Sequence, residues 1–353
     1  MSPVLQNILL IFGSTVGAGI FSLPVTLHKS GLFPFMIFMV LLSVLTAYVN
    51  MLYREIVEHT PGKHQLPGYA KIILGVEASR FAVFFILSSI CGALLAFLIL
   101  GGTFLGNLVS IPSDIASLIF FGVVFLLVYF DGKHLEKIDM IMSVVKMIFL
   151  LILVAVSITT LTSGKAFDIP FMGARPFYAY GSILFALTGF TIIPELRRNK
   201  HMKKSIFSAQ TIISILYVFF AICLFPFLSG NQLMFAENWK RVIFDIAGVS
   251  AVFTPYLLMT WVGYDIFSKD LHLSKRSSLI LILCIPLVLF LSGLQSFSGI
   301  LSLTGGVFLG GIAILISKMY REKFPSKHVL ANLIIQVIFL GGVIYEIYKF
   351  MFG

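Results

Sequence analysis

The sequence has very little charge. Asp, Glu, Lys and Arg make up only 11% of its 353 residues, whereas soluble domains carry about 25% charged residues. Apolar residues account for 59% of the chain, so its charged side chains cannot cover a water-facing surface. We therefore expect lipid to be the main solvent, and we predict a multi-pass protein of the cell membrane, specifically the inner membrane of a prokaryote.

Reactive and metal-binding patterns are also missing. The three cysteines Cys91, Cys223 and Cys284 lie inside apolar runs, without disulfide or metal spacing, and are expected to be buried apolar side chains. The seven His residues form no His-x-x-x-His or carboxylate–His cluster, and no phosphate-binding loop or catalytic triad is found. The sequence thus predicts that the protein has no metal and no cofactor, that it does not hydrolyse ATP, and that it is not an enzyme.

The net charge of +10 does not indicate a nucleic-acid partner. The basic residues sit in short loops between apolar runs and form no basic face. With the N-terminus in the cytoplasm, 18 of the 25 Lys and Arg residues fall in inner loops and 6 on the outer side, and Lys146 lies within a span. This alternating bias predicts a cytoplasmic N-terminus.

The apolar runs predict eleven membrane spans, because about 20 apolar residues cross the hydrocarbon core. In chain order they cover residues 4–27, 32–54, 80–109, 114–131, 139–162, 175–196, 204–229, 243–267, 277–294, 297–317 and 329–351. The one long connection, 55–79, has an apolar stretch after Pro67-Gly68. We expect a short helix there, lying on the membrane surface.

Spans one and six carry helix-weakening residues at equivalent places. Span one has three glycines within 13–19, and each weakens a helix by about 1 kcal/mol. The spacing from Gly19 to Pro24 recurs from Gly189 to Pro194, 170 residues later. Matching breaks in two halves are typical of a binding site in the middle of a transporter. Close helix packing through these glycines is the alternative.

Two such breaks would suit a zwitterion. A half-helix N-terminus offers N–H groups and a partial positive charge, so Gly17, Ala18 and Gly19 are predicted to hold a carboxylate. Carbonyls near Thr15, Phe185 and Leu187 would accept hydrogen bonds from an ammonium group. The full predicted substrate-binding set is Ser14, Thr15, Val16, Gly17, Ala18, Gly19, Phe185, Leu187, Thr188 and Gly189.

Three stretches carry a family resemblance. Residues 13–24 (GSTVGAGIFSLP) are similar to the first-helix signature of the amino acid–polyamine–organocation superfamily, and most closely to aromatic amino acid permeases and amino acid/auxin permeases. Residues 185–194 and 263–271 resemble their sixth and eighth helices. Span six lacks the histidine often found near the break in that family, which bears on the substrate more than on the fold.

The resemblance implies an all-α membrane protein with a LeuT-type fold. Its single domain, 1–353, would contain two inverted five-helix repeats, about 4–162 and 175–317, and a peripheral eleventh helix, 329–351. The substrate would bind between spans one, three, six, eight and ten.

Lys146 is the candidate for coupling. It lies eight residues into its span, about 12 Å deep, where a cation costs about 2.5 kcal/mol or more. In the resembled fold this part of span five faces a sodium site, and some proton-coupled members are understood to have a lysine there. We therefore predict a coupling proton on Lys146; the alternative is a lysine that snorkels to the interface. A second prediction is a sodium site formed by Ser250 and Thr254. The alternative is that both hydroxyls make ordinary hydrogen bonds to the backbone of their own helix.

Together these features predict a secondary active amino acid transporter that works by alternating access, specifically a proton-coupled symporter for neutral amino acids, aromatic ones included. Sodium symport and exchange are the alternatives within transport. A different class is a permease-like amino acid sensor, such as a subunit of a spore germinant receptor.

Overall fold

The computed structural model describes residues 3–62, 64–130, 169–196, 201–228, 238–270 and 273–352. All regular structure in these ranges is helical, which confirms the all-α prediction. The predicted fifth span, 139–162, and with it Lys146, lies outside the described residues.

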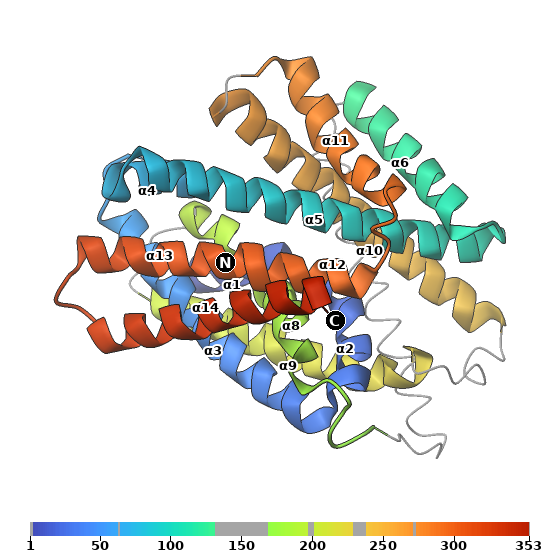
Figure 1. Cartoon of the computed structure of the whole chain (residues 1–353), viewed down its shortest axis with the longest axis horizontal. Coiled ribbons are helices and arrows are strands. Elements are labelled where there is room, and N and C mark those ends of the chain that lie inside the picture. The colour runs from blue at the N-terminus through green and yellow to red at the C-terminus, as the bar shows by residue number, and fades with distance from the viewer. Residues whose placement is uncertain are drawn as a thin grey trace. The chain divides into compact units, whose positions relative to one another are not determined.

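The chain divides into two compact units, whose elements can be followed in Figure 1. Unit 1 comprises Met1–Ser89, Pro170–Phe219 and Ser302–Gly353, and unit 2 comprises Ile90–Ile169 and Phe220–Leu301. Three helices run from one unit into the other: α5 (Val76–Val109), α9 (Met202–Leu228) and α12 (Phe297–Leu303). Each unit therefore contains segments from both predicted repeats.

Unit 1 contains both helices that were predicted to break. Its further elements are α1 (Pro3–Thr15), η1 (Ala18–Ser22), α2 (Leu23–Ser30), α3 (Leu32–Glu58), α4 (Leu66–Leu74), η2 (Pro176–Tyr178), α8 (Ala179–Leu187), η3 (Phe190–Glu195), η6 (Thr304–Leu309), α13 (Gly310–Lys323) and α14 (Val329–Phe352). The short segments η1, η2 and η3 are 3₁₀-helical, and η6 is π-helical.

Unit 2 is built around α10 (Asn238–Asp265), which packs against α6 (Ser113–Phe130) and α11 (Lys275–Leu291). The π-helical segment η5 (Ile266–Asp270) follows α10 directly. Aromatic side chains fill this unit: the ring of Phe120 makes edge contacts with Phe253 and Tyr256. Such contacts bury large apolar areas, which favours this packing.

Seven helices of the described residues are long and apolar enough to cross a membrane, and an eighth span results if α1 and the bent segment after it count as one. The predicted spans match them, although several helices continue beyond the predicted bounds. For example, α5 begins at Val76 and α13 ends at Lys323, because hydropathy marks only the apolar part of a helix, whereas helical hydrogen bonding continues into polar turns. The short helix expected within 55–79 is α4.

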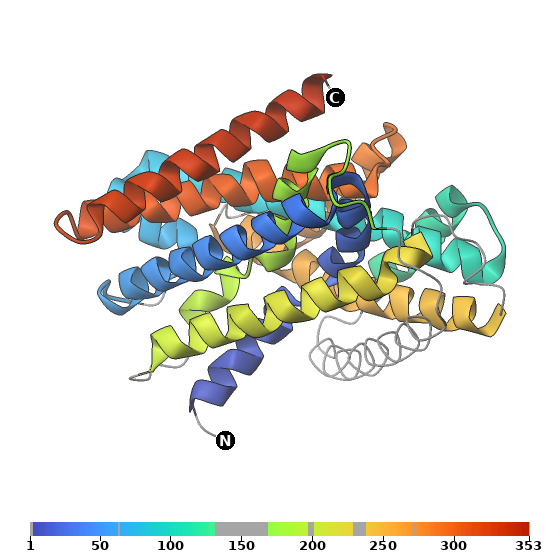
Figure 2. The ribbon, with the colours of Figure 1, turned by 90° about the horizontal axis from the view of Figure 1, so that it is seen from below.

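The eleventh span pairs with span ten. Figures 1 and 2 show α13 and α14 as an antiparallel pair at the C-terminal end of the chain. Buried polar side chains contact α14 at two levels: the Ser317 hydroxyl of α13 donates to Asn332 Oδ1 (3.2 Å), and the Ser302 hydroxyl of α12 donates to Glu346 Oε1 (2.9 Å). Polar contacts of this kind hold helices together in lipid, where the hydrophobic effect does not.

Candidate substrate site at two helix breaks

The first break interrupts span one. α1 ends at Thr15, Gly17 has extended backbone angles (φ −138°, ψ −155°), and the chain resumes as η1. The helical segments before and after the break are bent by 57°. Glycine weakens helical structure at this point, and only η1 and α2 restore it. The predicted interruption is thus confirmed, and it lies at residues 16–17.

The second break interrupts span six. α8 ends at Leu187, Thr188 is extended, and Gly189 (φ −134°, ψ 40°) leads into η3, which contains Pro194. α1 and α8 therefore end 172 residues apart, close to the offset of the glycine–proline motifs. This predicted interruption is confirmed as well.

The two breaks meet inside unit 1. α8 packs against η1 and α2, while α1 packs against η3, so the two broken spans run antiparallel with their breaks side by side. A Cβ on Gly19 would come within 3.1 Å of Phe185 Cδ1 and of the Ala186 backbone, and a Cβ on Gly189 would overlap the Thr15 hydroxyl. Glycine at these two positions allows the breaks to approach each other.

The other two glycines, Gly13 and Gly17, do not pack against a described helix. Among the described residues, no heavy atom lies within 4 Å of a Cβ placed on Gly13 or Gly17. Their small size is therefore not required by a neighbouring helix in this part of the chain. Gly17 borders space next to the break.

Helix α9 supplies donors to both breaks, which the sequence analysis missed. The Tyr217 hydroxyl donates to the Thr15 carbonyl (3.0 Å). Gln210 Nε2 donates to the Leu187 carbonyl (3.3 Å). Both side chains are buried. Their seven-residue spacing places them on one face of α9, and that spacing in an otherwise apolar span was the available signal.

The other predicted side chains mostly bond within their own helix. The hydroxyl of Ser14 donates to the Ile11 carbonyl (3.0 Å), and that of Thr188 to the Leu184 carbonyl (2.5 Å). The buried Thr15 hydroxyl has no hydrogen-bond partner in the structure's described ranges. Within those ranges we also find no acceptor for the backbone N–H of Gly19 or of Gly189. Unpaired N–H groups are expected where a half-helix begins.

The remaining members of the set frame the breaks. Val16 is buried and Phe185 half-buried, and the Phe185 carbonyl accepts a bond from the Thr188 N–H (3.4 Å). Ala18 opens η1, but its side chain is outside the described part. The structure thus brings the predicted backbone groups together, while their role toward a substrate stays a prediction.

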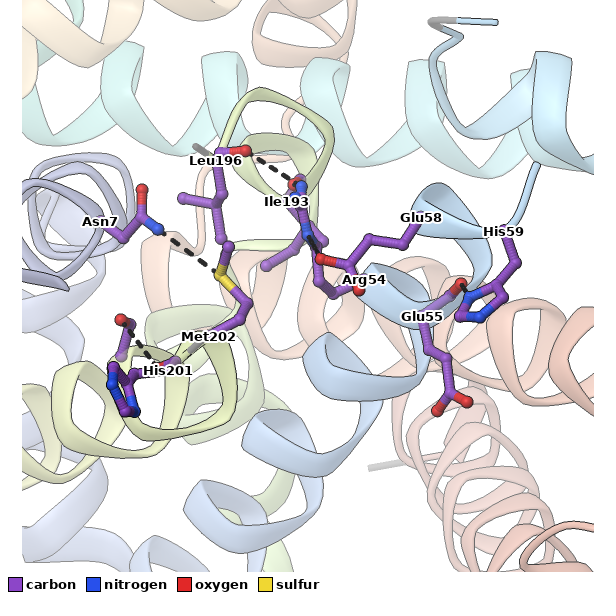
Figure 3. Close-up of polar contacts among 10 residues, drawn as sticks. Asn7, Arg54, Glu55, Glu58, His59, Ile193, Leu196, His201 and Met202 are labelled. Atoms are coloured by element: carbon purple, nitrogen blue, oxygen red, sulfur yellow. Dashed lines mark hydrogen bonds and ion pairs between the residues drawn. The ribbon is translucent and has the colours of Figure 1, made fainter. Parts of the chain in front are cut away.

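The far end of span six is held by an arginine, as Figure 3 shows. Arg54 of α3 is buried, and its Nη1 donates to the carbonyls of Ile193 (3.3 Å) and Leu196 (3.0 Å) at the end of η3. Its Nε donates to Glu58 Oε1 (2.9 Å). A cation at a helix C-terminus satisfies free carbonyls and complements their partial negative charge.

The predicted sodium ligands lie in unit 2, on α10. The Ser250 hydroxyl donates to the Ile246 carbonyl of its own helix (2.9 Å), which is the ordinary bonding expected as the alternative. The Thr254 hydroxyl is buried without a hydrogen-bond partner among the described residues. An ion-binding role for this pair stays a prediction.

Solved structures share this architecture. The chain is similar to MhsT in complex with L-phenylalanine, with 15% identity, 97% of each chain covered and a TM-score of 0.68. It is also similar to the Eremococcus coleocola manganese transporter, for instance the H236A mutant, with 14% identity, a TM-score of 0.58, and 97% of this chain and 91% of that chain covered. No curated protein sequence matches the chain.

These similarities and the paired helix breaks show a LeuT-type fold, and a family match identifies a secondary membrane transporter, not an enzyme. The sequence model of the tryptophan/tyrosine permease family matches residues 1–238. The chain belongs to the tryptophan/tyrosine permease family.

Proposed function

We propose that this protein is a proton-coupled symporter that carries neutral aromatic amino acids, tryptophan or tyrosine first, across the cell membrane by alternating access. Its family and the L-phenylalanine bound by MhsT support this substrate class. The observation that carries the proposal is the meeting of two helix breaks within one unit, with Gly19 against Phe185 and Gly189 against Thr15. We also assign the chain to the amino acid–polyamine–organocation superfamily, with its N-terminus in the cytoplasm.

In this proposal the main chain recognises the zwitterion. The N–H groups at the start of η1 and η3, those of Gly19 and Gly189 included, bind the substrate carboxylate, because helix N-termini favour anions. The ammonium group binds carbonyls at the ends of α1 and α8. The Thr15 and Leu187 carbonyls already accept from Tyr217 and Gln210, but a carbonyl has two lone pairs and can accept a second bond.

The coupling proton is assigned to Lys146, which lies outside the described residues. The support is its place within an apolar run, since intramembrane ionisable residues are functional candidates by default. The variant Lys146→Met tests this assignment, because methionine has a side chain of similar length but no amine that could carry a proton.

Uptake and binding of labelled tryptophan test the proposal in proteoliposomes that contain the purified full-length chain. We expect accumulation that depends on an inward proton gradient, and no requirement for sodium. Lys146→Met should retain binding and exchange but lose proton-driven accumulation. Binding without any accumulation in the parent protein would instead indicate a sensor. Sodium-dependent accumulation that is unaffected by Lys146→Met would contradict proton coupling.

A further inference from the structure

The eleventh span carries a buried carboxylate. α14 is long and apolar enough to cross a membrane, and Glu346 is its only acidic residue. Only four of the 24 residues of α14 are buried, and Glu346 is one of them, with 0% of its side chain exposed. An ionisable side chain within a membrane span is costly to bury and is a functional candidate by default.

Three side chains form the Glu346 cluster: Glu346, Lys349 and Ser302. Glu346 Oε1 accepts a hydrogen bond from the Ser302 hydroxyl of α12 (2.9 Å), and Oε2 forms an ion pair with Lys349. Lys349 Nζ also donates to the Ser302 hydroxyl (2.6 Å), so each member bonds to the other two. The Lys349 ammonium lies 4.8 Å from the ring centroid of Tyr178 in η2. The cluster therefore joins α14 to α12 and to the segment that leads into α8.

Two glycines make room for the carboxylate between α8 and η6. A Cβ on Gly306 of η6 would overlap Glu346 Cγ, and a Cβ on Gly181 of α8 would lie 2.7 Å from Glu346 Oε1. A side chain at either position would displace the carboxylate, so glycine is required there. Glu346 thus lies directly against both helical segments.

The contact between η6 and α8 continues to the second helix break. Gly305 packs its backbone on α8, since a Cβ there would overlap the Gly181 carbonyl and lie 2.7 Å from the backbone nitrogen of Phe185. Gly181 and Phe185 are one helical turn apart and share a face of α8. Phe185 is the one residue of α8 that is not fully buried, and its carbonyl accepts from the N–H of Thr188 in the break. A shift of η6 along α8 would therefore displace Phe185.

The π-helical form of η6 adds to this picture. Such turns are rare and are found mostly at functional sites. In η6 the N–H of Gly310 bonds to the carbonyl of Gly305, five residues back. Gly305 faces α8 and Gly306 faces Glu346, so this unusual turn is held between two helices. Buried polar contacts can fix the register of neighbouring helices.

We propose that Glu346 is a positioning residue for transport. Through Ser302 and Gly306 it fixes the register of η6 on α8, and with it the place of Phe185. The inference rests on the proposed function, since Phe185 belongs to the site proposed for tryptophan. It gives α14 a role in transport, whereas the family resemblance implies a peripheral helix.

The test compares two buried polar contacts of α14 in the purified full-length protein. The double variant Glu346→Leu, Lys349→Met removes the cluster without leaving a buried charge unpaired, so it should keep most of its stability. Asn332→Leu is the matched control, because Asn332 is equally buried and bonds to Ser317 of α13, about 21 Å along the helix from Glu346. Glu346→Gln keeps the shape of the side chain without its charge and is the second variant if the double variant does not fold.

Two measurements are made on each folded variant. Tryptophan affinity should fall about tenfold in the Glu346 variants and stay within about twofold of the parent value in Asn332→Leu. Hydrogen exchange in 183–188 should rise in the Glu346 variants alone, with or without tryptophan. A cluster that served stability only would lower the melting temperature and leave tryptophan affinity unchanged.

The outcomes separate this inference from the proposed function. Unchanged hydrogen exchange in 183–188 of the Glu346 variants would overturn the inference. Unchanged affinity in a parent protein that binds tryptophan would do the same, and so would equal changes in Asn332→Leu. If the proposed function is wrong, the parent protein will not bind tryptophan, but hydrogen exchange will still distinguish the Glu346 variants from the control.

Discussion

The two helix breaks have similar sequences but different support. After the first break the chain forms η1 and then α2, so eight residues of regular α-helix follow. After the second break the chain forms only η3, six residues of 3₁₀-helix that contain a proline. The first half-helix thus restores its own hydrogen bonding, whereas the second depends on Arg54 of α3 for the carbonyls at its end.

The breaks also differ in how close they are to other atoms. In the first break, no described atom lies within 4 Å of a Cβ placed on Gly17. In the second break, a Cβ placed on Gly189 would overlap the Thr15 hydroxyl. We infer that the first break is shaped to leave room for a ligand, and the second to join the two spans. This difference can be tested by substitutions, from the largest expected effect to the smallest.

Arg54→Gln should have the largest effect and should act on the second break alone. It removes charge-assisted bonds to two carbonyls, each worth about 1.5–3 kcal/mol, so we expect roughly 3 kcal/mol of lost stability and little remaining uptake. Hydrogen exchange should rise in 190–195 but not in 18–30. Arg80→Gln, in an exposed pair with Glu77, is the control and should cost less than about 1 kcal/mol. Equal exchange in both half-helices would argue against this asymmetry.

Gly189→Ala should be the next most damaging, because its methyl group overlaps the Thr15 hydroxyl. Overpacking of this kind costs about 1–3 kcal/mol. The double variant with Thr15→Ala should recover most of that stability, and thermal unfolding of the single and double variants measures the coupling. Strictly additive effects would mean that the two side chains do not meet.

Tyr217→Phe should have a moderate effect, about 1–2 kcal/mol, because it leaves the buried Thr15 carbonyl without its donor. Gln210→Leu should cost less, since its bond to the Leu187 carbonyl is longer, 3.3 Å against 3.0 Å. Urea unfolding of both purified variants provides the comparison. A larger loss in Gln210→Leu would reverse the inferred order of the two supports.

Gly17→Ala should leave stability unchanged within about 0.5 kcal/mol, since its backbone is extended and no described atom is near its Cβ. The added methyl group should still weaken tryptophan binding severalfold, because it enters the space proposed for the substrate. Gly13→Ala, equally open but within α1, is the matched control for binding. The same affinity in both variants would place the substrate elsewhere.

Much of this architecture could be read from the sequence. Low charge and long apolar runs determined that the protein lies in lipid, because these residues cannot form a water-facing surface. They also determined the all-α class, because a helix satisfies its own backbone hydrogen bonds in lipid. The glycines and prolines at 13–24 and 185–194 determined where two spans lose helical bonding, since this weakness is local to the backbone.

Only the tertiary structure decided which groups satisfy the freed backbone. Tyr217 and Gln210 are about 200 and 20 residues from the carbonyls they bind, and Arg54 is well over 100 residues from η3. Such pairings depend on how helices cross. From the sequence, Gly17 and Gly19 were predicted to have the same role. In the fold, Gly19 packs against α8, whereas no described atom lies within 4 Å of a Cβ placed on Gly17. Backbone propensity is set by neighbours in the chain, whereas hydrogen-bond partners and open space are set by neighbours in the fold.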